Sequence, residues 1–329
     1  MATLSHEGFR KCIESFGGCD EYFTEMINAA SLINNGPWEK FYTISEAAPG
    51  KTVWQLTGNE VSKIRDAAAL LCKKDGIGID INMGCSAPQI YKTGAGISWM
   101  TKDQAETGEL VNEVRHVLDS YQKETGEHKR LSVKCRLGDE NFTSESFISF
   151  CSMLYESGVE LITLHPRTKK EKYRGLPRYE YAELLARELP LVTVYVNGCI
   201  KDFNSASFAL KKCPSVKGLM IAREAVKKPW IFAELKCAFE AHEAGSSYEP
   251  VHTVDREKIL LDFIDDVLKY QPEEFHKTRL QRFFSYYCEQ FSFGHWFTMR
   301  LINSKSTEEC IEKIKEYFLH NPDDKFISY

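Results

Sequence analysis

Between residues 19 and about 225, short apolar runs alternate with longer amphipathic stretches, and this alternation constrains the fold more than any other feature. The short runs are typical of buried strands, and the stretches between them have helical spacing. Strands that alternate with helices favour βαβ units and a parallel sheet. The predicted strands are Tyr22–Met26, Val53–Leu56, Ile77–Ile81, Leu131–Cys135, Leu161–Leu164, Leu191–Val196 and Gly218–Ile221.

Seven such repeats are more than most doubly wound sheets contain and approach the eight of a TIM (β/α)8 barrel. A TIM barrel is therefore the α/β fold that we predict. No Gly-x-Gly-x-x-Gly follows the first strand, so a Rossmann dinucleotide site has no support. The predicted barrel helices are Glu60–Lys73, Lys102–Tyr121, Ser144–Ser157, Tyr179–Leu189 and Phe203–Lys212.

After Trp230 the pattern becomes helical throughout. Pro272 separates two of the helical stretches, and no strand-like alternation is visible. We therefore predict a barrel domain over residues 1–239 and a small helical domain over residues 240–329. The expected C-terminal helices are Glu234–Ala244, Asp255–Tyr270, Phe275–Phe291 and Thr307–Phe318.

Polar side chains follow consecutive predicted strands at their carboxyl ends. A TIM barrel places its active site at that rim, so we expect these side chains to share one site. The simpler alternative is that strand ends are wet and polar for that reason alone, which explains one or two positions better than a whole series. The residues are Gln55, Asn82, Cys85, Lys134, Arg136, His165, Arg167, Asn197 and Arg223.

Three groups of residues at or near these strand ends indicate particular chemistry. Cys85 lies on a glycine-punctuated loop, where a thiol is a candidate catalytic group. Lys134 lies inside an apolar strand, so it needs an anion, either a reduced flavin ring or a carboxylate of the barrel. Asn197-Gly198 and Ala222-Arg223 end the last two strands, where barrels bind phosphate; a plain turn with a surface Arg is the alternative.

Five motifs occur in a characteristic order: Asn-Met-Gly-Cys-x-Ala-Pro from residue 82, Lys-x-Gly-Ala-Gly from 92, His-x-Arg-Thr from 165 with a following Tyr-x-Gly, Asn-Gly-x-Ile from 197, and Ala-Arg-x-Ala with Pro-Trp-Ile-Phe from 222. In these motifs the chain resembles the tRNA-dihydrouridine synthases. Those enzymes are FMN-dependent TIM barrels with a helical C-terminal domain that reduce uridine in tRNA. The resemblance covers residues 1 to about 235 well.

The resemblance implies that Cys85 protonates C5 of uracil while reduced FMN, recharged by NADPH, delivers hydride to C6. Thiols have a reference pKa of about 8.5, so they are mostly protonated at neutral pH yet can release the proton. Asn82 and Arg167 are expected to contact a uridine that has left its stack. The implied FMN-binding residues are Met1, Gln55, Lys134, His165, Asn197, Gly198, Cys199, Ala222 and Arg223.

A run of basic residues adjoins the His-x-Arg-Thr motif, and we predict that it binds tRNA phosphates. The alternative is a solvated loop. The net charge of −5 argues against a protein that coats nucleic acid over its whole surface but allows a local basic track. The residues of the run are Lys169, Lys170, Lys172 and Arg174.

The chain departs from the family pattern at its start and at the phosphate loop. Family members usually begin the barrel with Leu-Ala-Pro-Met, whose Met corresponds to Met1. With only seven strands predicted, we expect the first strand either upstream of residue 1 or formed by Met1–Leu4. Cys199 replaces a usual Asp and Ala222 a usual Gly, which predicts a tighter phosphate loop.

Two other functions stay open at this point: an FMN barrel that acts on a free pyrimidine or enone, and a tRNA-binding relative without catalysis. The eleven cysteines form no Cys-x-x-Cys and no zinc-type cluster, so we expect no metal and a reduced, cytoplasmic protein. No apolar run is long enough to span a bilayer, and no signal-peptide pattern is present. We expect no membrane association and no obligate protein partner.

Overall fold

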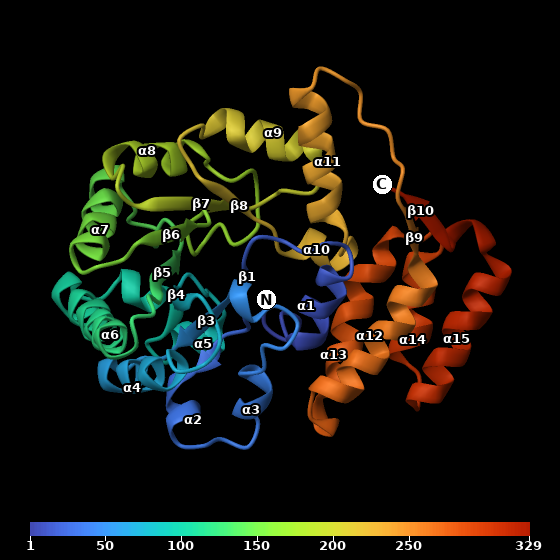
Figure 1. Cartoon of the computed structure of the whole chain (residues 1–329), viewed down its shortest axis with the longest axis horizontal. Helices are drawn as coiled ribbons and strands as arrows, with labels where there is room; N and C mark the ends of the chain where they lie inside the picture. The colour runs from blue at the N-terminus through green and yellow to red at the C-terminus, as the bar shows by residue number, and fades with distance from the viewer. The chain divides into compact units, whose positions relative to one another are not determined.

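The computed structural model describes residues Met1–Tyr329 and divides into two compact units. The first unit consists of Met1–Asp20, Glu46–Ala48 and Ala222–Tyr329, and the second of Glu21–Ser45 and Pro49–Ile221. Figure 1 shows the elements of both units along the chain. The predicted domain boundary at residues 239 and 240 stays a prediction; the division of the structure falls between Ile221 and Ala222.

The second unit is built on a parallel sheet of eight strands. Tyr22 pairs with Thr52, and Ile27 pairs with Leu56, so the first two short strands pair with opposite ends of the third. They therefore occupy a single position at one edge of the sheet. The strands are β1 (Tyr22–Phe23), β2 (Ile27–Asn28), β3 (Thr52–Thr57), β4 (Gly78–Met83), β5 (Arg130–Cys135), β6 (Leu161–Leu164), β7 (Thr193–Asn197) and β8 (Gly218–Met220).

The sheet is curled and flanked by helices, as Figure 1 shows, which confirms the predicted TIM-barrel architecture. Its strands follow one another in chain order, and the edge strand β8 does not pair with β1 or β2. The expectation that Met1–Leu4 forms a strand is wrong. These residues form turns, in which the backbone N–H groups of Leu4 and Ser5 donate to the Met1 carbonyl at 3.1 and 2.9 Å.

Helices α6, α7 and α9 of the second unit begin at side-chain caps. Asp103 accepts a hydrogen bond from the backbone N–H of Ala105, and Gly126 ends the same helix in the left-handed conformation. Thr143 and Asp202 form capping boxes. The helices are α2 (Ala29–Ile33), α3 (Glu39–Tyr42), α4 (Val61–Leu71), α5 (Pro88–Tyr91), α6 (Gln104–Thr125), α7 (Ser144–Glu156), α8 (Glu180–Glu188) and α9 (Phe203–Lys212), with 3-10 turns η1 (Pro49–Lys51) and η2 (Gly96–Met100).

Side chains of the central strands alternate between two chemically different faces of the sheet. Leu56, Ile81 and Val133 represent the apolar face and are wholly buried. Most of the intervening positions on the opposite face are polar, and the register places Gln55 beside Asp80 and Asp80 beside Ser132. This polar face therefore brings groups from neighbouring strands within hydrogen-bond reach.

The first unit is mainly helical and has an aromatic core. The rings of Phe263 and Phe283 stack with centroids 3.7 Å apart, and those of Phe297 and Tyr317 at 3.9 Å. Its elements are α1 (Glu7–Glu14), α10 (Arg223–Lys227), α11 (Ile231–Glu243), α12 (Arg256–Tyr270), α13 (Glu273–Tyr287), α14 (Gly294–Ile302), α15 (Thr307–His320), η3 (Cys288–Gln290), η4 (Pro322–Asp324) and the antiparallel pair β9 (Thr253–Asp255) and β10 (Phe326–Ser328).

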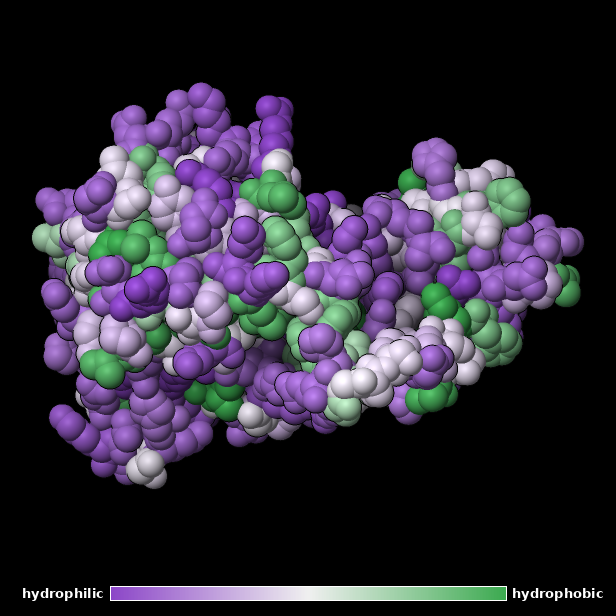
Figure 2. All heavy atoms as spheres, turned by 90° about the horizontal axis from the view of Figure 1, so that it is seen from above, coloured by the Kyte–Doolittle hydropathy of each residue, from purple (hydrophilic) through white to green (hydrophobic).

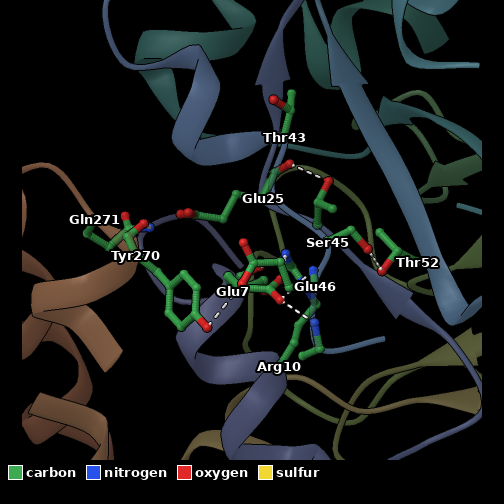
Figure 3. Close-up of polar contacts among 12 residues, drawn as sticks. Glu7, Arg10, Glu25, Thr43, Ser45, Glu46, Thr52, Tyr270 and Gln271 are labelled. Atoms are coloured by element: carbon green, nitrogen blue, oxygen red, sulfur yellow. Dashed lines mark hydrogen bonds and ion pairs between the residues drawn. The ribbon is translucent and has the colours of Figure 1, made fainter. Parts of the chain in front are cut away.

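A polar network ties the segment Glu46–Ala48 to α1 within the first unit. Figure 3 shows the Glu7 carboxylate between Arg10 and the backbone of this segment. Glu7 Oε1 accepts from the Glu46 backbone N–H at 2.7 Å and from that of Ala47. The Tyr270 hydroxyl donates to Glu46 at 3.3 Å. Because Glu7 is wholly buried, these bonds satisfy a charge that would otherwise be costly.

None of the helices is both long and apolar enough to span a bilayer. The face drawn in Figure 2 is largely hydrophilic, with hydrophobic residues dispersed among charged and polar ones.

Candidate active site

Cys85 lies on the loop that leaves β4 at the carboxyl edge of the sheet, and its side chain is half-buried. The backbone N–H of Cys85 donates to Asn82 Oδ1 at 2.9 Å, and that of Gly84 donates to the same oxygen at 3.3 Å. The Cys85 carbonyl accepts from the Ile97 N–H at 3.1 Å. The loop is therefore held from two directions.

Gly96 is required by this arrangement. Its φ is +60°, and an added Cβ would lie 2.6 Å from the Cys85 carbonyl oxygen. Any other residue would therefore strain the backbone and push the thiol-bearing loop away. The Lys-x-Gly-Ala-Gly motif thus packs directly against the back of Cys85.

A chain of buried side chains continues from Asn82 across the polar face. Asn82 Nδ2 donates to Gln55 Oε1 at 3.0 Å, and Gln55 Nε2 donates to Asp80 Oδ2 at 2.7 Å. The Ser132 hydroxyl donates to Asp80 Oδ1 at 2.8 Å. All four side chains are buried, so β3, β4 and β5 are linked through side-chain hydrogen bonds.

Lys134 lies one position further along β5 on the same face and has no carboxylate in ion-pair range. Its only side-chain partner is Asn197 Oδ1, at a long 3.4 Å, while Asn197 Nδ2 donates to the Met220 carbonyl at 2.7 Å. Burial, reinforced by the charge of Arg136, lowers the pKa of Lys134 to about 8. An anionic ligand would stabilise the charged form of such a lysine. A flavin fits this requirement, and the absence of a nearby carboxylate disfavours the alternative of a barrel salt bridge.

Arg136 connects the Cys85 loop to the loop after β6. Its Nε donates to the Gly84 carbonyl at 3.0 Å, and its Nη1 to the Lys172 carbonyl at 3.0 Å. The exposed ring of Tyr173 lies 5.6 Å from the guanidinium and stacks against His165 with centroids 6.1 Å apart. Arg136 and Tyr173 therefore border the same edge as the thiol.

Arg167 joins the end of β6 to the turn after β7. It bonds to His165 Nε2 at 2.8 Å, to Cys199 Sγ at 3.2 Å and to the Gly175 carbonyl. Gly198 has φ +131°, and an added Cβ would lie 2.9 Å from Pro177 and 3.2 Å from the His165 ring. The close approach of this turn to His165 therefore depends on glycine.

The structure thus brings together most of the predicted site residues within the second unit. Hydrogen bonds and ring contacts link Gln55, Asn82, Cys85, Lys134, His165, Arg167, Asn197, Gly198 and Cys199 into neighbouring groups. Met1, Ala222 and Arg223 belong to the first unit, where Met1 begins a turn and Ala222 caps α10. Their predicted contacts with FMN stay predictions.

Of the four basic residues in the run after His165, two form ion pairs with acidic side chains and two do not. Lys169 pairs with Asp139 at 3.0 Å, and Lys170 pairs with Glu140 at 3.2 Å. The side chains of Lys172 and Arg174 are exposed and have no acidic partner. No carboxylate of the chain offsets the positive charges of these last two residues, so both are available to bind phosphate.

The family model for dihydrouridine synthase matches residues 1–316. The chain belongs to the dihydrouridine synthase family.

Named relatives agree with this assignment. The chain is 30% identical over 240 residues to a probable tRNA-dihydrouridine synthase of Aquifex aeolicus, covering 72% of this chain and 71% of that protein. It is 24% identical over 265 residues to tRNA-dihydrouridine synthase B of Pseudomonas putida, covering 80% and 73%. A mouse tRNA-dihydrouridine(47) synthase-like protein, whose name includes NAD(P)(+), is 28% identical over 249 residues. The match covers 72% of this chain but about a third (35%) of that protein.

One polar residue of this candidate site, Asp80, received no role from the sequence. Asp80 stands between Ile79 and Ile81, so we included it in a strand without assigning it a role. The available signal was a charged residue two positions before Asn82, on the same face of the strand. Tyr173 was noted only as part of a motif.

Asp80 should make the stability of this family member depend on pH. Burial raises its pKa to about 6, against about 3.9 in an unfolded chain. The ionised form is therefore disfavoured on folding, so the Asp80 contribution to stability is present below about pH 4 and is lost as pH rises through 6. The penalty at pH 8 is on the order of 3 kcal/mol.

Asp80→Asn in ligand-free protein is therefore expected to be more stable than wild type at pH 8, with the advantage shrinking towards pH 4. Urea unfolding of both proteins at several pH values measures this difference. A difference that does not change with pH would contradict the assignment.

Proposed function

We propose that this dihydrouridine synthase family member reduces uridine in tRNA to dihydrouridine, with FMN as cofactor and NADPH as electron donor. The observation that carries the proposal is the half-buried Cys85 on a loop anchored by Asn82 and Arg136, near a Lys134 that lacks an anionic partner. Such a site needs an anionic ligand, and it offers a proton donor beside it. The names of the relatives support tRNA as the substrate.

When bound, FMN supplies the hydride that uracil receives at C6. The residues proposed to hold it are Gln55, Lys134, His165, Asn197, Gly198 and Cys199 of the second unit; the contacts of Met1, Ala222 and Arg223 with FMN stay separate predictions. Lys134 would stabilise negative charge on the ring, and the Cys85 thiol would donate its proton to C5.

Two polar groups remain for recognition of the base. One N–H of Asn82 Nδ2 bonds to Gln55, which leaves the second N–H for a carbonyl of uracil. The exposed Tyr173 ring can stack on a flipped base. Arg167 is almost wholly buried and holds His165 and Cys199, so a direct contact with uridine stays a prediction.

The deciding experiment combines purified protein, FMN and NADPH with tRNA from a strain that lacks dihydrouridine. We expect flavin absorbance in the protein and new dihydrouridine at defined positions, mapped by mass spectrometry. A protein that stays colourless after FMN addition would contradict every flavin-enzyme reading and leave a non-catalytic tRNA-binding relative. Turnover of free uracil or an enone, without change in tRNA, would favour another FMN barrel.

The unpaired basic residues are expected to contribute to tRNA affinity. Lys172→Ala combined with Arg174→Ala should weaken binding and flatten the slope of log K against log salt by about 1 to 2. Lys169→Ala combined with Lys170→Ala is the matched control, because Asp139 and Glu140 already offset those charges. Filter binding over a salt series measures both. Equal effects of the two variants would place the phosphate contacts elsewhere.

A further inference from the structure

The series of hydrogen bonds from Asp80 through Gln55 and Asn82 to the Cys85 loop, called here the relay, can form with only one arrangement of donors and acceptors. At one end, the backbone N–H groups of Gly84 and Cys85 are donors, so Asn82 must turn its oxygen towards them. Asn82 then presents its nitrogen to Gln55. At the other end, an ionised Asp80 has only acceptors, so Gln55 must turn its nitrogen towards it.

The backbone N–H groups at one end and the Asp80 carboxylate at the other therefore require one and the same orientation of the Asn82 and Gln55 amides. A group at position 80 that cannot accept would leave Gln55 Nε2 without a partner in a buried site. Rotation of the Gln55 amide by half a turn would not help, because its oxygen would then lack a donor and its nitrogen would face the Asn82 nitrogen. The cost of the orphaned donor would therefore favour movement of the Gln55 side chain towards another acceptor. That movement would break its bond with Asn82 Nδ2 and free Asn82 Oδ1 from its orientation towards Cys85.

We propose that Asp80 is a positioning residue: by orienting Gln55 and Asn82, its carboxylate fixes the backbone that carries the Cys85 thiol. The consequence for catalysis rests on the proposed function of Cys85, whereas the effect on the loop does not. Asp80 itself lies two hydrogen bonds away from Asn82 and touches neither thiol nor base. The relay aligns a proton donor, and a displacement of about 1 Å in such a group can cost on the order of 10²-fold in rate.

A second role for Asp80 would be purely electrostatic. Its charge faces Lys134 and Arg130 of β5, although no ion pair joins them; Arg130 pairs instead with Glu21 at 2.6 Å. Asp80→Asn separates the two roles, because its oxygen can still accept from Gln55 while its nitrogen donates to the Ser132 hydroxyl, which can reverse. Asp80→Leu removes both the charge and the acceptor.

The test measures hydrogen exchange of the Gly84 and Cys85 amides in FMN-free protein, by mass spectrometry with residue resolution. We expect Asp80→Leu to speed exchange at least about tenfold, and Asp80→Asn to stay within about twofold of wild type. Thr163→Val is the matched control, since Thr163 is a wholly buried polar residue of β6 whose hydroxyl has no partner. If Asp80→Leu does not fold, Gln55→Met breaks the same relay one step later and should speed exchange equally.

Dihydrouridine formation from pre-reduced enzyme provides the second measurement. Asp80→Leu should slow it about 100-fold, whereas the rate of Asp80→Asn should stay within about threefold of wild type. Unchanged exchange in folded Asp80→Leu or Gln55→Met would overturn the proposal, as would an Asp80→Asn protein impaired as much as Asp80→Leu. Should wild type form no dihydrouridine, the proposed function fails while the exchange result still decides the relay.

Discussion

Cys85→Ala is expected to lose dihydrouridine formation by about 10²- to 10⁴-fold, the range that a positioned general acid contributes. Flavin binding and reduction by NADPH should stay within about twofold of wild type, because Cys85 holds its neighbours through its backbone rather than its thiol. Alanine preserves those backbone bonds. The expected phenotype is therefore a flavoprotein that accepts electrons but fails to pass them to tRNA.

Stopped-flow flavin absorbance measures the first half-reaction, and mass spectrometry of tRNA measures the second. Cys237→Ala is the control, since Cys237 lies on α11 in the first unit and has no place in the proposed chemistry. Normal dihydrouridine levels in tRNA from cells that carry only Cys85→Ala would refute the proton-donor role.

Lys134→Met should make the bound flavin harder to reduce, because a half-buried cation near the ring favours the negatively charged reduced form. We expect a more negative midpoint potential, by about 30 mV for each tenfold loss of preference for the reduced form. Reduction by NADPH should slow by about 10- to 100-fold. The alkyl part of Lys134 has a close match in Met, so the polar face is otherwise little changed.

The pH dependence of this effect has a definite sign. Without a ligand the pKa of Lys134 is about 8, so the charge is present below pH 8 and is lost above it. An anionic ligand raises that pKa, and binding therefore takes up a proton near pH 8. The wild-type potential should fall more steeply with rising pH above 8 than that of Lys134→Met.

Lys129→Met is the matched control for this measurement. Lys129 is more deeply buried than Lys134, but it precedes the first residue of β5 and donates to the Gly76 carbonyl at 2.6 Å. Its replacement should lower stability and leave the flavin potential unchanged. A potential that shifts equally in both variants would show that general loosening of β5, rather than the charge of Lys134, is responsible.

Elements with strong local signals were predicted closely. The predicted strand Leu161–Leu164 coincides with β6, and the predicted helix Phe203–Lys212 coincides with α9, which Asp202 caps. The antiparallel pair of β9 and β10 was missed because strands of three residues have no measurable period and their pairing spans most of the C-terminal region. The helix α14 was missed because it begins with Gly294 and has no side-chain cap.

The candidate site was predictable where it depends on strand order. Parallel strands end at one edge, so Asn82, Lys134 and Asn197 could be assigned to a common rim from the sequence. Hydrogen-bond direction could not be predicted, since it depends on which side-chain atoms meet across strands. The role of Asp80 depends on such a bond. The ion pairs of Lys169 with Asp139 and of Lys170 with Glu140 likewise depend on side chains that meet only in the folded chain.

The discontinuity of the first unit has a consequence for synthesis of the chain on the ribosome. Helix α1 packs on α12, where Lys11 pairs with Asp266 at 2.6 Å, yet about 240 residues separate the two helices. At roughly 5–20 residues per second, α1 waits on the order of ten seconds to a minute for its partner. During that interval the apolar side chains of Phe9 and Ile13, buried in the finished protein, lack the surface that covers them. The strands of the second unit are complete before α12 leaves the ribosome, so α1 is made before them and reaches its native contacts after them.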